Sequence, residues 1–123
     1  MSTLAVGTIK SASSAAPVFQ NTSGTEIGQL GKVWALINMS GGSILDSFGV
    51  SSISDQGTGT FDVNFTTALT NVNACAVASS SDSTLHTQIV DGNCDANGFR
   101  YRCLDGGGSL SDDPFTGFIL FDN

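Results

Sequence analysis

Residues 60–67 alternate between large apolar and polar side chains, and this period of two is the feature that most constrains the fold. Phe61, Val63 and Phe65 are separated by single polar residues. Successive side chains of a strand point to opposite faces, so the segment is expected to be a β-strand with one buried and one exposed face. Residues 99–104 show the same alternation and predict a second strand of this kind.

The composition favours the same fold class. Ser and Thr supply 29 of the 123 residues and Gly supplies 15, whereas Glu occurs once. Helices favour Ala, Leu, Lys and Glu, while Ser, Thr, Gly, Asn and Asp belong to strands, turns and caps. We therefore expect an all-β protein, an antiparallel β-sandwich that is jelly-roll-like. The expected strands span residues 33–39, 44–46, 48–53, 60–67, 73–79, 85–90, 99–104 and 116–122.

The first 31 residues show scattered apolar side chains without a sustained period. This pattern predicts an extended N-terminal arm at residues 1–31 and a β-sandwich domain at residues 32–123. The apolar side chains that would attach the arm to another surface are Leu4, Val6, Ile9, Val18, Phe19, Ile27 and Leu30. A sandwich of this size gains from oligomerisation, and the apolar segment 116–122 suggests burial against a neighbouring subunit. We expect a homotrimer.

The charge balance excludes several partners. Lys and Arg together number four and the net charge is −7. Nucleic-acid binding requires clustered cations, and anionic membranes attract them, so neither partner is expected. No apolar run reaches the 18 or so residues of a transmembrane helix, and residues 1–10 lack the pattern of a signal peptide.

No set of residues predicts catalysis or metal binding. His86 lies in a predicted strand, and the sequence has no G-x-S-x-G motif for a nucleophile. The chain has three cysteines, Cys75, Cys94 and Cys103. Because an odd number cannot all pair in disulfides, separate thiols are expected, and a bridge between Cys94 and Cys103 is the alternative. Their spacing does not match a zinc site, and residues 91–98 fail the register of a calcium loop. We expect no enzyme, no metal and no cofactor.

Two blocks of the chain resemble small tail-fibre-like structural proteins of tailed bacteriophages, of the type found in aquatic phages. Residues 32–38, KVWALIN, are similar to the family's K-A-W-V-N-F stretch. Residues 48–69, FGVSSISDQGTGTFDVNFTTAL, resemble its F-N-V-S-S-I-T-D-N-G-T-G-x-Y-x-V-N-F-T-T-A-M stretch. Shorter similarities near the N-terminus extend the resemblance to about residues 2–78. Leu36 and Ile37 depart from the V-N-F pattern, and the chain has no long shaft.

The resemblance implies a virion structural protein that is assembled in the bacterial cytoplasm, a tail fibre or fibre-tip module for host attachment. Its partners would be further copies of itself, other virion proteins and a host surface glycan or protein. Polar loops on a rigid sandwich are the usual place for recognition. The candidate receptor-binding residues are Ser80, Asp82, Asp91, Asn93, Asp95, Asn97, Arg100, Tyr101, Arg102 and Asp112. A capsid decoration protein that stabilises the phage head is the main alternative, followed by a non-viral carbohydrate-binding module and an enzyme.

Overall fold

The computed structural model describes residues 6–9, 19–28, 31–69 and 75–121, and this part of the chain contains strands and turns but no helix. None of the described segments therefore forms a helix long and apolar enough to span a membrane. The chain divides into two units, Met1–Leu30 and Gly31–Asn123. The strands are β1 (Phe19–Gln20), β2 (Glu26–Gly28), β3 (Val33–Asn38), β4 (Ser43–Phe48), β5 (Val50–Asp55), β6 (Thr60–Phe65), β7 (Cys75–Ser80), β8 (His86–Asp95), β9 (Gly98–Leu104) and β10 (Thr116–Phe121).

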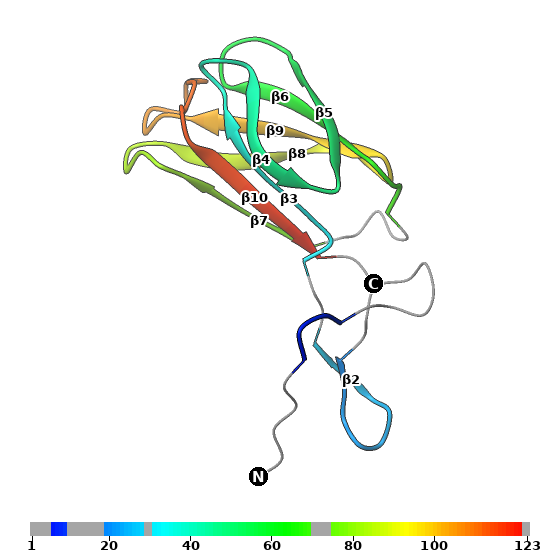
Figure 1. Ribbon diagram of the computed structural model, residues 1–123. Helices are drawn as coiled ribbons and strands as arrows, with labels where there is room; N and C mark the ends of the chain where they lie inside the picture. Colours follow the sequence, from blue (N-terminus) through cyan, green and yellow to red (C-terminus); the bar gives the residue numbers. More distant parts are fainter. Residues whose placement is uncertain (1–5, 10–18, 29–30, 70–74, 122–123) are drawn as a thin grey trace. The chain divides into compact units, whose positions relative to one another are not determined.

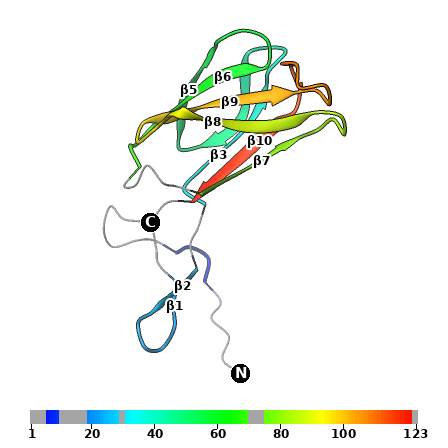
Figure 2. The same ribbon diagram turned by 180° about the vertical axis from the view of Figure 1, so that it is seen from behind.

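Two four-stranded antiparallel sheets form the second unit. Sheet I has the order β4-β3-β10-β7 and sheet II has the order β5-β6-β9-β8. The sheets lie face to face as two layers, with sheet I toward the viewer in Figure 1 and sheet II toward the viewer in Figure 2. This arrangement confirms the predicted all-β antiparallel sandwich. It shares its eight strands and two layers with a jelly roll, although the pairs β3–β4, β5–β6 and β8–β9 are hairpins within one sheet.

Aromatic side chains from both sheets fill the space between the layers. Phe99 of sheet II meets Phe118 of sheet I edge to face, with the ring centroids 4.8 Å apart. Phe61 and Val63 are buried on the inner face of β6, whereas Asn64 is exposed, as the alternation of residues 60–67 predicts. Burial of each large apolar side chain contributes about 1.5–3 kcal/mol, so this inner face is the main source of stability.

The segment 91–98 differs from the sequence-based expectation. The sequence predicts a loop, but β8 continues to Asp95 and only Ala96 and Asn97 form the turn into β9. The register of β8 against β9 is irregular between Val90 and Asp95, where four residues of β8 lie opposite one residue of β9. Such an insertion is a β-bulge, which bends the strand and redirects its side chains.

The first unit contains a small hairpin of β1 and β2. The Asn21 side-chain oxygen accepts hydrogen bonds from the backbone N–H groups of Ser23 (3.0 Å) and Thr25 (2.9 Å), and Gly24 has a positive φ of 80°. Residues 21–24 therefore form the turn between β1 and β2. The predicted boundary after residue 31 lies one residue from the division between the two units.

Candidate functional site

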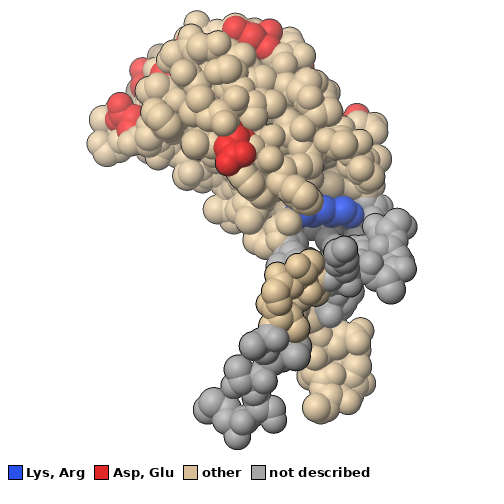
Figure 3. Space-filling view, in the orientation of Figure 1, with Lys and Arg blue, Asp and Glu red and all other residues tan. Residues whose placement is uncertain are grey.

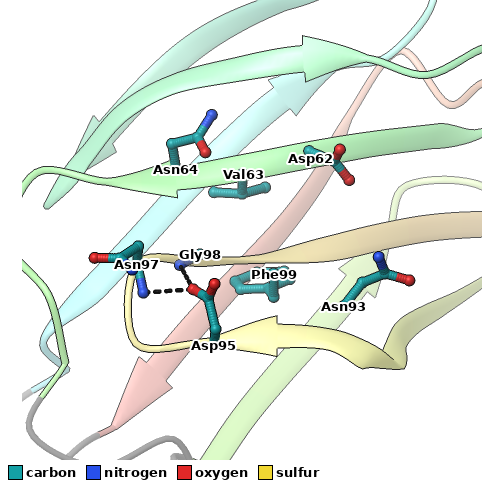
Figure 4. Close-up of a pocket in the computed structure, with 8 residues that line it drawn as sticks. All are labelled: Asp62, Val63, Asn64, Asn93, Asp95, Asn97, Gly98 and Phe99. Atoms are coloured by element: carbon teal, nitrogen blue, oxygen red, sulfur yellow. Dashed lines mark hydrogen bonds between the residues drawn. The ribbon is translucent and has the colours of Figure 1, made fainter.

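A polar hollow of about 160 Å³ lies on sheet II beside the turn that joins β8 to β9 (Figure 4). It includes three of the predicted receptor-binding residues, Asn93, Asp95 and Asn97. The sequence analysis did not connect these residues with β6, which supplies the opposite wall. The residues that line the hollow are Asp62, Val63, Asn64, Asn93, Asp95, Asn97, Gly98 and Phe99.

Gly98 lines the hollow at the start of β9. It pairs with Asn64 of β6 on one side and with Asp95 of β8 on the other. A Cβ atom at this position would collide with the backbone carbonyl oxygen of Val63. The close approach of β6 and β9 therefore requires glycine here.

Asp95 holds the turn beside the hollow in place. Its Oδ1 accepts hydrogen bonds from the backbone N–H groups of Asn97 (2.6 Å) and Gly98 (3.1 Å), which appear as dashed lines in Figure 4. An aspartate that accepts bonds from the residues just after it is a common way to fix a tight turn. Asn93 comes from the bulged part of β8 and is exposed.

Asp62 forms the other wall of the hollow and is paired with Arg100. The Arg100 Nε and one terminal guanidinium nitrogen donate to the two carboxylate oxygens at 2.6 and 2.8 Å. The hydrogen bond from Arg100 holds the pKa of Asp62 below its usual value of 3.8. The pair is partly exposed, so it is screened by solvent and orients both side chains more than it stabilises the fold.

The hollow offers amide and carboxylate groups, which donate and accept hydrogen bonds, around a small open space. This chemistry suits a neutral ligand rich in hydroxyl or amide groups. His86, the one histidine of the chain, is exposed on β8. Among the described residues, no group of three or more His, Cys, Asp or Glu side chains is placed to hold a metal ion.

The remaining candidate residues do not join the hollow. Ser80 and Asp82 lie at the β7–β8 turn, and Asp112 lies in the loop between β9 and β10. Figure 1 shows these two connections at the end of the sandwich opposite the β8–β9 turn. The candidate receptor-binding residues therefore lie at both ends of the sandwich.

Tyr101 requires a correction. The sequence analysis names it as a receptor contact beside Arg100 and Arg102, but its side chain is 0 % exposed in the core. Its hydroxyl forms a hydrogen bond with the Thr116 hydroxyl and donates another to the backbone carbonyl oxygen of Ser79 at 3.3 Å. The alternation of β9 explains the error, because the two arginines point to the outer face and Tyr101 points inward.

Asp113 is a structural residue that the sequence analysis did not single out. It is 0 % exposed, and its carboxylate accepts hydrogen bonds from the Ser80 hydroxyl, the Ser81 N–H (2.9 Å), the Ser81 hydroxyl (2.7 Å) and the Phe115 N–H (2.8 Å). These bonds join the β9–β10 loop to the end of β7. Burial would raise the pKa of Asp113, but the four hydrogen bonds outweigh it and hold the pKa below 3.8.

The predicted attachment residues of the first unit are described only in part. Val6, Ile9 and Phe19 are 52 %, 60 % and 43 % exposed, which is high for apolar side chains. Ile27 lies in β2. Leu4, Val18 and Leu30 lie outside the described residues.

The three cysteines are not joined by a disulfide. Cys75 and Cys94 are exposed and Cys103 is buried. The expectation of separate thiols is confirmed, and the alternative bridge between Cys94 and Cys103 is absent.

Comparisons of the chain with protein-family models, with curated proteins and with solved structures found no match.

Proposed function

We propose that the chain is a structural protein of a bacteriophage virion, a tail-fibre or fibre-tip module that attaches the particle to its bacterial host. The resemblance of residues 2–78 to tail-fibre-like proteins supports the virion role. The observation that carries the attachment role is the polar hollow beside the β8–β9 turn, which unites Asn93, Asp95 and Asn97 with Asp62. A rigid sandwich with exposed polar groups at one end is well suited to surface recognition.

The proposed ligand is a glycan or protein of the host surface. The hollow supplies hydrogen-bonding groups, while its one aromatic side chain, Phe99, is buried and provides no exposed ring for stacking. At about 160 Å³ it is smaller than the roughly 300–1,000 Å³ of a typical small-molecule pocket. Each site would therefore bind weakly, and display of several copies on one particle would raise the overall affinity.

The first unit would attach the module to other virion proteins. Its exposed apolar side chains Val6, Ile9 and Phe19 are suited to burial against such a partner. Assembly would take place in the cytoplasm of the host bacterium, and the mature location would be the virion.

Competition for host cells tests this function. Purified protein added to host bacteria is expected to slow adsorption of the phage that encodes it. Asn93→Ala removes an exposed amide from the hollow and is expected to increase the protein concentration needed for half inhibition. Gln56→Ala removes an exposed amide from the β5–β6 turn and serves as the matched control, with no expected change. Absence of competition by the wild-type protein would contradict the attachment role.

A further inference from the structure

A row of apolar side chains crosses the outer face of sheet I. Phe48 of β4 pairs with Trp34 of β3, Trp34 pairs with Ile119 of β10, and Ile119 pairs with Val77 of β7. Paired residues lie side by side on the same face of a sheet, so these four side chains form one continuous line. We call this line, Phe48–Trp34–Ile119–Val77, the apolar band.

The apolar band is open to solvent for much of its length. Phe48 is 60 % exposed, Val77 is 58 % exposed and Ile119 is 36 % exposed. Beside the band, the missing side chain of Gly117 leaves a hollow of about 280 Å³. Removing such an apolar surface from water is favourable, and a contiguous exposed apolar patch usually marks an interaction site.

Charge is nearly absent from this face, although the chain carries a net charge of −7. Among the strand residues whose register places them on the outer face of sheet I, all of them described, Asp46 alone is charged. Figure 3 shows the same side of the molecule, with almost no acidic or basic side chains over β3, β10 and β7. Two copies of an acidic protein repel one another least when such faces meet.

We propose that the apolar band is an interface between copies of this chain, in which a second copy covers the band and inserts an apolar side chain into the hollow beside Gly117. A strongly acidic partner surface or an anionic membrane is a poorer fit, because the band contains no cationic side chain that would attract either of them. A glycan is a poorer fit because the band itself offers no hydrogen-bonding groups except the Trp34 indole N–H. The inference stands independently of the virion role.

The size of the face determines how strong this association would be. Each strand of sheet I has six residues. At about 3.3 Å per residue and 4.8 Å between strands, the face measures roughly 20 by 19 Å, or about 400 Å² in projection. A standard interface buries about 800 Å² per partner. We therefore expect reversible self-association that depends on protein concentration.

Trp34 provides a built-in reporter, because it is the only tryptophan of the chain and lies in the apolar band. Sedimentation velocity across a concentration series gives the mass of the species, and Trp34 fluorescence with acrylamide quenching reports whether the band is covered. We expect the wild-type mass to rise with concentration while the Trp34 emission shifts to the blue and becomes harder to quench.

Two matched variants separate this face from other surfaces. Val77→Asp places a charge in the apolar band, and Gln88→Asp places the same charge on exposed Gln88 of β8, the corresponding edge strand of sheet II. Val77→Asp is expected to weaken self-association at least ~10-fold, equivalent to about 1.4 kcal/mol, and Gln88→Asp to leave it nearly unchanged. Circular dichroism and thermal melting of both variants confirm that they are folded.

Three outcomes would overturn the proposal. One is a wild-type protein that stays monomeric up to about millimolar concentration. Another is a monomer whose Trp34 is already shielded from acrylamide, because another part of the chain would then cover the band. The third is self-association that folded Val77→Asp and Gln88→Asp weaken equally, because the contact would then lie elsewhere.

Discussion

Replacement of Asp113 is expected to destabilise the sandwich more than replacement of any neighbouring exposed aspartate. The carboxylate is buried and accepts two bonds from backbone N–H groups, those of Ser81 and Phe115, and two from the Ser80 and Ser81 hydroxyls. In Asp113→Ala the hydroxyls can rotate to other acceptors, and the Ser81 N–H keeps its bond to the Phe115 carbonyl oxygen (2.9 Å). The Phe115 N–H loses its partner. Each buried donor left without a partner costs about 1–3 kcal/mol.

The expected loss for Asp113→Ala is therefore about 1–3 kcal/mol of unfolding free energy. Small domains are stable by only about 5–15 kcal/mol, so this is a large fraction of the total. For a domain of this size, 1 kcal/mol shifts the melting temperature by roughly 4–8 °C, which predicts a decrease of about 4–24 °C. Asp113→Asn retains one acceptor oxygen and is expected to lose about half as much.

Urea unfolding followed by circular dichroism measures this loss directly. Asp112→Asn is the control: Asp112 is exposed and accepts one bond, from the Gly59 N–H at 2.6 Å, which the amide oxygen can still accept. We expect this control to lose less than about 1 kcal/mol. Equal losses in Asp113→Ala and Asp112→Asn would refute the role of Asp113 as the link between the β9–β10 loop and β7.

The pH dependence of the same variants gives an independent check. The pKa of Asp113 is lower in the folded state than its usual value of 3.8, so the unfolded state takes up protons first as the pH falls. The contribution of Asp113 to stability is therefore present above pH 3.8 and is lost as the pH falls through the folded-state pKa. The stability difference between the wild type and Asp113→Asn should shrink below about pH 4. A difference that stays constant down to pH 2 would contradict this mechanism.

Three further predictions concern single residues. Tyr101→Phe removes a buried hydroxyl, and urea unfolding should show a loss of about 1–2 kcal/mol of unfolding free energy. In the wild-type protein, absorbance titration should find no tyrosinate below about pH 11, because burial raises the pKa of Tyr101 to about 12. Gly59→Ala should fold poorly, as judged by yield and melting temperature, because Gly59 has a φ of +61° and a Cβ would lie 2.6 Å from the Cys103 carbonyl oxygen. In the native protein a thiol reagent should modify Cys75 and Cys94 rapidly and Cys103 only after unfolding, because Cys103 is buried and burial raises its pKa.

The sequence could predict those strands that have one face buried in the core and the other exposed to solvent. Residues 60–67 and 99–104 alternate with a period of two, and both are strands of sheet II. The segment 91–98 could not be assigned in this way. Asp, Gly and Asn favour turns, but they also occur in β-bulges, and only the pairing of β8 with β9 distinguishes the two.

The candidate site depended on long-range pairing that no local pattern contains. Asn93, Asp95 and Asn97 could be nominated because they are polar and close in sequence. Asp62 could not be joined to them, since the strand order β6-β9-β8 is what places it across the hollow. Asp113 was missed for the same reason, because an aspartate in a polar loop is usually solvated and its partner Ser80 is 33 residues away.

The apolar face of sheet I had a sequence signal of its own. Residues 33–39 are apolar at nearly every position, and the segment 116–122 contains four consecutive apolar residues at 118–121. From the second segment the sequence analysis inferred burial against a neighbouring subunit. The structure buries the inner side chains of β3 and β10, while Trp34 is half-buried and Ile119 is exposed on the outer face. The apolar side chains of these two segments therefore belong partly to the core and partly to the exposed outer face of sheet I.

Immunogold electron microscopy of intact phage particles tests the central claim most directly, with antibodies raised against residues 79–123. The account predicts gold at the tail or its fibres. Gold spread over the head would contradict the attachment role and favour a capsid decoration protein, and particles without gold would contradict the virion role itself.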